Sequence, residues 1–291
     1  MTYAVLGVSG HTGKVVAETL LEQGKRVRAV VRDASKAAAL KAKGAEVAIA
    51  DLGDASALSK ALSGVEGAYV LIPPSFAPGF RDYQNRTTDA LVSAAKQAQP
   101  PQLVLLSSIA AHQPAGTGPI AGIHYTEQQL RTLTKTHSTF LRAAYFMENL
   151  GSSLGMLNDG VLPSFFPADF EFEMVATHDV GIAAAKLLVE GTSKTRVVDV
   201  KGPRGSFAKA AQVLSELTAK PIRVAEAPMD AAVPTLTSFG FPTDLAELYR
   251  DMMAGMLSGL IRFEPGHEQI IGKTPLKQVL AELLAQNAKV R

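Results

Sequence analysis

Short apolar runs alternate with amphipathic stretches through the first half of the chain. The runs consist mainly of Val, Ile, Leu and Ala and predict buried strands at 3–6, 27–31, 47–50, 68–72, 103–106 and 139–141. Apolar residues at helical spacing between them predict helices at 12–23, 35–43, 54–62, 82–97 and 123–134. The runs are continuous, so the sheet should be covered on both faces. Repeated strand–helix–strand units predict an α/β protein with a doubly wound parallel sheet of the Rossmann type.

The second half has a looser pattern. A stretch rich in Gly, Pro and Phe spans 151–169, and the tail from residue 231 onward reads as separate helices. Between these segments the pattern predicts a strand at 197–200 and helices at 178–188 and 207–217. We therefore expect a dinucleotide-binding domain over 1–150. A smaller, mostly helical cap over 151–291 should cross back to the sheet and help to bind substrate.

Composition narrows the functional classes. Among the 291 residues, 29 Lys and Arg nearly balance 27 Asp and Glu, and no basic run is present, which argues against a nucleic-acid binder. The chain has no cysteine, its six histidines show no metal-ligand spacing, and no apolar run approaches the roughly 18–20 residues of a membrane span. The first predicted strand begins at residue 3, so we expect no signal peptide and a cytoplasmic location.

A glycine-rich turn joins the first predicted strand to the first predicted helix. Gly7 permits the tight turn, Gly10 lets the backbone approach a pyrophosphate, and Gly13 lets the helix lie close to the strand. The free N–H groups at the helix N-terminus would then face the phosphates. The alternative is a turn that serves packing only. The candidate cofactor-binding residues here are Gly7, Ser9, Gly10, His11, Thr12 and Gly13.

The end of the second predicted strand indicates which nicotinamide cofactor fits. An NAD site places an acidic residue there to bind the ribose 2′-hydroxyl. This chain has Arg32, followed by Asp33 and, one turn on, Lys36. A guanidinium can make a bidentate contact with a 2′-phosphate, which favours NADPH. In the alternative, Arg32 is a solvated charge and Asp33 binds the ribose.

Three further strand ends supply candidate cofactor contacts, because ligands bind at the carboxyl edge of open α/β sheets. Asp51 and Leu52 follow the third strand, where Asp51 either accepts from the adenine amino group or only starts a turn. The fourth and fifth strands end in Ile72-Pro73-Pro74 and Ser107-Ser108. The serines either bind ribose or substrate, or cap the loop.

These residues resemble the NmrA-like family of atypical short-chain dehydrogenases/reductases over nearly the whole chain. The matching segments are Gly7 to Gly13, Val31-Arg32-Asp33, Leu106-Ser107-Ser108, Leu141-Arg142, Phe146-Met147-Glu148-Asn149, Val175 to Gly181, Gly202-Pro203 and Thr274-Pro275-Leu276. The resemblance implies a Rossmann domain, NADP(H) binding and a small cap over the nicotinamide. Some members reduce quinones, dyes or phenylpropanoid compounds, and others sense the dinucleotide and regulate partner proteins.

The proton-relay motif of ordinary short-chain dehydrogenases, Tyr-x-x-x-Lys, does not occur, because none of the six tyrosines has lysine four residues on. His124 is the candidate catalytic residue, since it falls where similar proteins carry His or Lys and an imidazole titrates near neutrality. Glu127, one helical turn on, is expected to orient it. Alternatively, His124 is a solvated residue at a helix start. Tyr145 and Phe146 either line the cleft or belong to the core.

Two functional hypotheses follow. In the first, the protein is an NADPH-dependent oxidoreductase that transfers hydride to a quinone or a similar aromatic or enone acceptor, with water or His124 as proton source. Phe165 to Phe172, with Phe239 and Phe241, would form an apolar wall for the acceptor, or simply core. In the second, it is a non-catalytic NADP(H)-sensing regulator that acts through a protein partner. The sequence leaves a homodimer open.

Overall fold

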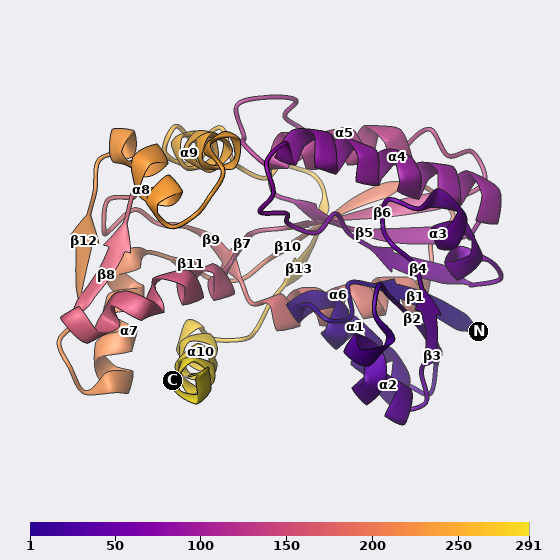
Figure 1. Cartoon of the computed structure of the whole chain (residues 1–291), viewed down its shortest axis with the longest axis horizontal. Coiled ribbons are helices and arrows are strands. Elements are labelled where there is room, and N and C mark those ends of the chain that lie inside the picture. Colours follow the sequence, from indigo (N-terminus) through magenta and orange to yellow (C-terminus); the bar gives the residue numbers. More distant parts are fainter. Residues whose placement is uncertain (291) are drawn as a thin grey trace.

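The computed structural model describes residues 1–290, so Arg291, the last residue of the expected second region, lies outside the described residues. An eight-stranded parallel sheet forms the larger lobe (Figure 1). The strand order is β13 (Glu268–Ile271), β10 (Arg196–Lys201), β6 (His137–Ala143), β5 (Gln102–Ser108), β4 (Gly67–Val70), β1 (Thr2–Leu6), β2 (Arg26–Val31) and β3 (Glu46–Ile49).

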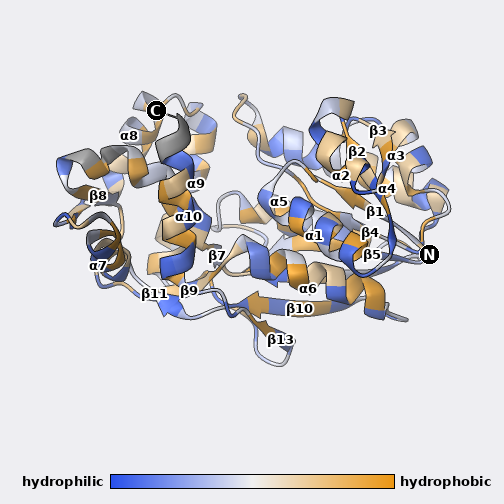
Figure 2. Ribbon diagram, turned by 90° about the horizontal axis from the view of Figure 1, so that it is seen from below, coloured by the Kyte–Doolittle hydropathy of each residue, from blue (hydrophilic) through white to orange (hydrophobic). Residues whose placement is uncertain are grey.

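Helices cover both faces of this sheet, as the continuous apolar strands require. One face carries α1 (His11–Glu22), α2 (Ala38–Ala42) and α6 (Thr177–Glu190), and the other carries α3 (Ala55–Leu62), α4 (Phe80–Ala98) and α5 (Ile120–Leu130) (Figure 1). Each face has its own apolar core. In Figure 2, α6 shows blue and orange residues side by side, as expected of a helix with one face on the sheet and one in water.

The smaller lobe is mostly helical. It contains the 3₁₀ segments η2 (Met147–Asp159) and η3 (Met229–Ala231), and the helices α7 (Phe207–Thr218), α8 (Ala232–Ser238), α9 (Thr243–Leu257) and α10 (Leu276–Val290). A two-stranded parallel ribbon pairs β8 (Val161–Ser164) with β12 (Arg223–Glu226). A small sheet of β11 (Arg204–Gly205), β9 (Phe172–Val175) and β7 (Tyr145–Phe146) lies between the lobes (Figure 1). No helix in residues 1–290 has the length and apolar character needed to cross a membrane.

The predicted fold class, a doubly wound parallel sheet with a smaller helical part, is confirmed. The sequence missed β13, because this short edge strand is largely exposed and lacks an apolar run. Two strands from the second half, β10 and β13, complete the large sheet. The division of the chain into two domains near residue 150 stays a prediction.

Two carboxylates in the family-like segments fix the second half against the sheet. Glu148 accepts hydrogen bonds from the backbone N–H (2.9 Å) and hydroxyl (2.6 Å) of Thr177, the first residue of α6. Asp179 accepts from the backbone N–H and hydroxyl of Thr274, both at 2.9 Å. These contacts hold η2, α6 and the segment before α10 in one arrangement around the carboxyl edge of the sheet.

Candidate active site

The glycine-rich turn connects β1 to α1. Gly7 has a φ of +68°, a left-handed conformation that favours glycine, and its carbonyl accepts from the N–H of Gly10 at 2.9 Å. Gly10 is the N-cap of α1 and offers no side-chain cap. The first-turn amides of α1 therefore have no side-chain acceptor at the cap, as an anion site at a helix N-terminus requires.

Gly13 sets the distance between α1 and β1. A Cβ atom at this position would clash with the carbonyl oxygen of Gly7 and lie 2.8 Å from that of Leu6. A Cβ at Gly7 would lie 2.6 Å from the side chain of Leu71, which directly precedes Ile72. The turn therefore has no room for a side chain at Gly7 or at Gly13 unless its neighbours move. This close packing fits a dinucleotide pyrophosphate site.

The other residues of the turn differ in exposure. Ser9 and His11 are exposed at the start of α1. Thr12 is buried, and its hydroxyl accepts a hydrogen bond from the hydroxyl of Tyr69 at 2.8 Å. Burial raises the pKa of Tyr69 well above its usual range, so this donor keeps its proton. The Thr12 side chain therefore joins α1 to β4, which leaves its backbone N–H as the group to face a phosphate.

The end of β2 presents exposed cations. Arg32 and Lys36 are both exposed. Asp33, the alternative ribose ligand, caps the 3₁₀ helix η1 (Ala34–Ala37), where its carboxylate accepts from the backbone N–H (2.9 Å) and hydroxyl (2.8 Å) of Ser35. These bonds hold the pKa of Asp33 below its ordinary value. Asp33 thus serves as a cap, and the exposed Arg32 and Lys36 are the groups at this strand end with donors to offer a ligand.

The end of β3 and one face of α4 complete this corner. Asp51 accepts from the backbone N–H of Gly53 at 2.8 Å, so it starts a turn, and Leu52 beside it is partly buried. Burial raises the pKa of Tyr83 on α4, which also feels the charges of Arg32 and Asp51. The sequence did not identify Tyr83 as a site residue. A helical pattern does not show which turn of α4 lies near the ends of β2 and β3.

A cavity of about 690 Å³ opens at the carboxyl edge of the sheet. Five candidate residues from the sequence line it, namely Ile72, Ser107, Ser108, Tyr145 and Phe146. Pro73 and Pro74 continue from Ile72 into the segment before α4 and are not among the lining residues. The volume lies within the roughly 300–1,000 Å³ of small-molecule sites. Because Leu71 packs on Gly7 and Ile72 lines the cavity, the cavity and the glycine turn are neighbours.

Tyr145 brings a hydroxyl to this cavity. Burial, with Tyr249 nearby, raises the pKa of Tyr145 to about 12. The phenol is therefore neutral at neutral pH and can donate a hydrogen bond, but it gives up its proton reluctantly. Its ring meets that of Phe172 edge-on, with centroids 5.1 Å apart.

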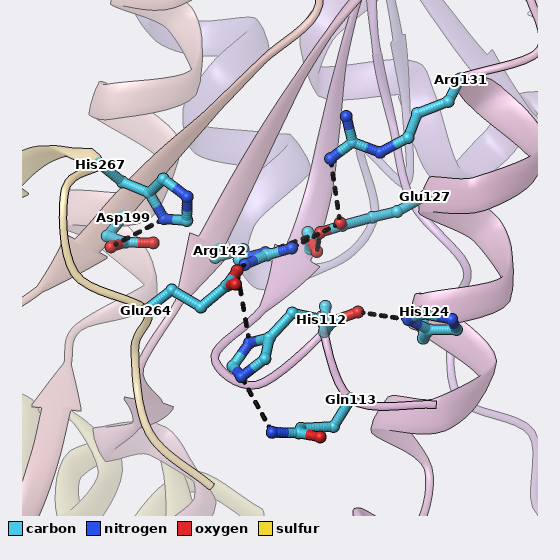
Figure 3. Close-up of polar contacts among 11 residues, drawn as sticks. His112, Gln113, His124, Glu127, Arg131, Arg142, Asp199, Glu264 and His267 are labelled. Carbon is cyan, nitrogen blue, oxygen red and sulfur yellow. Dashed lines mark hydrogen bonds and ion pairs between the residues drawn. The ribbon is translucent and has the colours of Figure 1, made fainter. Parts of the chain in front are cut away.

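His124 faces away from the main cavity. The residues of α5 that line the main cavity are Ile120 and Ile123. His124 instead lines a second pocket of about 450 Å³. Its Nδ1 lies 2.9 Å from the carbonyl oxygen of Ala111 (Figure 3). The expectation that Glu127 orients His124 is wrong, because Glu127 binds Ser107 and Arg142 instead. Catalysis by His124 stays a prediction.

A buried ionic network lies beneath the cavity (Figure 3). The carboxylate of Glu127 accepts hydrogen bonds from Nε and Nη2 of Arg142, at 3.0 and 2.8 Å, and from the hydroxyl of Ser107, at 2.5 Å. On its other side Arg142 donates to Glu264, whose carboxylate lies 3.6 Å from His112. Burial, aided by the charge of Arg142, lowers the pKa of His112, so its imidazole is neutral at neutral pH. Arg142 is thus a structural ion-pair partner and does not line the cavity.

The phenylalanines expected to form an apolar wall divide into three groups. Phe170 and Phe172 line the cavity, and Phe166 packs behind them with Phe207. Phe241 packs against Phe76 and Tyr249, while Phe239 is 67% exposed. The wall is therefore shorter than expected.

The second half supplies cavity residues that sequence reasoning missed. They come from the end of β10, from β11, from α9 and from the segment after it, and include Lys201, Arg204, Met252, Met256, Leu257, Ile261, Arg262 and Phe263. No motif marks them, because they are far apart in the chain and only the crossing of the two lobes brings them together.

Known proteins resemble this chain over most of its length. The model of the NmrA-like family matches residues 1–255. Quinone oxidoreductase 2 of Escherichia coli (strain K12) is 30% identical over 264 residues, which cover 88% of each chain. NAD(P)H azoreductase of Xenophilus azovorans is 27% identical over 256 residues, 86% of this chain and 85% of that one. The structure of Citrobacter sp. triphenylmethane reductase complexed with NADP(H) aligns with a TM-score of 0.78 at 23% identity, covering 97% of this chain and 99% of the other.

Proposed function

The chain belongs to the NmrA-like family, and from this premise we propose that it is an NADPH-dependent oxidoreductase that reduces a quinone or a similar aromatic or enone acceptor. The observation that carries the proposal is the apolar cavity at the carboxyl edge of the sheet, next to the glycine turn. Relatives described as a quinone oxidoreductase and an azoreductase support the same chemistry.

The residues at the sheet edge fit NADPH. The glycine turn and the N-terminus of α1 would bind the pyrophosphate, and Arg32 with Lys36 would bind the 2′-phosphate. Asp33 fits this choice, because its carboxylate already accepts two hydrogen bonds from Ser35 and so has a structural role at this strand end. Bound NADPH supplies a hydride, which together with one proton converts a quinone to the hydroquinone and leaves NADP⁺.

The chain's own residues hold the acceptor and manage the proton. Apolar side chains such as Leu106, Phe146 and Phe172 exclude water from the cavity and pack on an aromatic ring. Ser108 and the neutral phenol of Tyr145 line the same space and can donate hydrogen bonds to an acceptor oxygen. The proton comes from solvent or from His124, whose pocket adjoins the other side of α5. His124→Ala distinguishes these two sources.

Titration with NADPH and NADH, followed by addition of 2-methyl-1,4-naphthoquinone to the same cuvette, tests the proposal. We expect tighter binding of NADPH and rapid loss of its fluorescence once the quinone is added. Oxidation must be stoichiometric with hydroquinone formed. Tight binding without turnover of any quinone, dye or enone would refute the reductase and favour the dinucleotide sensor with a protein partner.

We further propose that the enzyme acts in the cytoplasm, since a chain without cysteine fits a reducing compartment. A homodimer stays a prediction.

A further inference from the structure

The cavity assigned to the acceptor carries two cations that form no ion pair among residues 1–290. These are Lys201 and Arg262. We propose that they bind an acidic substituent of the acceptor, a carboxylate or a sulfonate, so that the preferred substrate is an aromatic acceptor with an acid group. This inference rests on the proposed reductase function.

The other charged residues of the cavity form one ionic cluster of an arginine and two glutamates. Arg204 donates to the backbone carbonyl of Glu171 at 2.5 Å, and its guanidinium lies 3.7 and 3.9 Å from the carboxylates of Glu171 and Glu173. These three residues and the two cations are the charged groups that line the cavity. Three cations and two carboxylates leave the cavity with one surplus positive charge, and Lys201 and Arg262 are its cations without an ion pair among the described residues.

The two cations are both connected to Phe263, Lys201 through space and Arg262 along the chain. Lys201 is partly buried at the end of β10, and its Nζ is 6.0 Å from the ring centroid of Phe263. Arg262 precedes Phe263 and uses one donor, Nη1, to bind the carbonyl of Gly259 at 2.9 Å. Its remaining N–H donors are available for a ligand, and a guanidinium matches the two oxygens of a carboxylate or sulfonate.

The rest of the cavity suits an aromatic body. Its remaining lining is largely apolar and includes Ile72, Leu106, Ile109, Phe170, Phe172 and Met256. An acceptor would thus place its ring among these side chains and its acid group at the end near Phe263. A neutral acceptor would cover the partly buried Lys201 without giving it a partner, which lowers its relative affinity.

The segment that carries Arg262 is anchored from below. Glu264, two residues further on, accepts a hydrogen bond from Arg142 and lies close to His112 (Figure 3). Between Arg262 and Glu264 in the chain, the half-buried Phe263 packs against the main core. These contacts hold the backbone next to Arg262, and the bond to Gly259 orients its exposed guanidinium. Less entropy is lost on binding than with an arginine on a loose segment.

A matched pair of quinones tests the inference. We would compare 2-methyl-1,4-naphthoquinone with 1,4-naphthoquinone-2-sulfonate in the wild type, Arg262→Gln and Lys201→Met. Each substitution should lower kcat/KM for the sulfonate about threefold to fivefold, the upper end of the effect of one exposed charge contact. Turnover of the neutral quinone should fall less, so that the ratio of kcat/KM for the sulfonate to that for the neutral quinone falls, while the Kd of NADPH stays within about twofold. Lys209→Met, an exposed cation on α7 outside the cavity, should change neither.

A salt titration of the wild type gives an answer that does not depend on any variant folding. Raising KCl to about 0.5 M should weaken turnover of the sulfonate and not that of the neutral quinone. Equal changes for the two quinones, in the variants or with salt, overturn the inference and leave the reductase intact. Failure to oxidise NADPH with either quinone overturns the proposed function and this inference with it.

Discussion

Replacement of Arg142 by methionine tests whether the buried network stabilises the sheet edge. Arg142 is 3% exposed and Glu127 is 1% exposed. Their two hydrogen bonds, at 3.0 and 2.8 Å, are the closest contacts that Glu127 has with a positive charge, since Arg131 lies 3.8 Å away. Arg142→Met keeps much of the side-chain volume but leaves a buried carboxylate with a distant cation. Removing one partner of such a pair costs about 3–5 kcal/mol.

This loss is large against a total stability of roughly 5–15 kcal/mol. With an unfolding entropy of roughly 2.1 cal/mol/K per residue over 291 residues, it corresponds to a fall in Tm of about 5–8 °C. We would measure Tm by calorimetry at pH 7.5. The double variant Glu127→Met/Arg142→Met should recover most of the loss, because the only carboxylate among the described residues left without Arg142 is then Glu264, whose side chain is 40% exposed and solvated.

Arg250→Met is the matched control, because it removes an arginine from the ion pair with Asp251 at the surface, where both side chains are over 40% exposed. This variant should leave Tm essentially unchanged, since exposed pairs contribute little. If Arg142→Met also left Tm unchanged, water would be screening the pair and the argument from burial would fail. A double variant no more stable than Arg142→Met would show that the loss came from packing and not from charge.

Four other substitutions test the site. Gly13→Ala should abolish NADPH binding and lower Tm, because the new Cβ clashes with backbone atoms of Gly7 and forces α1 away from β1; unchanged binding in a fluorescence titration would contradict this. Arg32→Ala should weaken NADPH about tenfold and leave NADH unaffected, the loss of one charged contact; an equal loss for both would assign Arg32 a structural role. Asp199 on β10 is fully buried, with Oδ2 3.5 Å from Nδ1 of His267 (Figure 3), and Asp199→Asn should raise Tm more at pH 8 than at pH 4. Burial raises the pKa of Asp199, so ionising it costs the folded protein more, and stability is lost as pH rises through that pKa; a difference independent of pH would refute this. His124→Ala should lower kcat and shift its pH profile if the imidazole supplies the proton, and should change neither if solvent does.

The sequence determined the architecture, the glycine turn and the cations at the end of β2. Continuous apolar strands and helix-spaced apolar positions are local patterns, and they alone predicted the doubly wound sheet. The turn from Gly7 to Gly13 and the cation at Arg32 are also local, because a single β1–α1–β2 unit carries both. The carboxyl-edge rule placed Ile72, Ser107 and Ser108 at one edge, and these three residues line the cavity.

Only the tertiary structure decided the acceptor end. His124 and Glu127 are three positions apart, which places them about 60° apart around α5. The sequence therefore suggested that their side chains meet. Packing of α5 on the sheet instead buries Glu127 against Arg142 of β6 and turns His124 toward another pocket. The cations Lys201 and Arg262 enter the cavity because β10 joins the large sheet and the segment after α9 returns to it. A one-dimensional pattern records which face of an element is apolar. It does not record which distant element covers that face, so the pairing of buried charges and the lining of the cavity emerge only when the two lobes pack together.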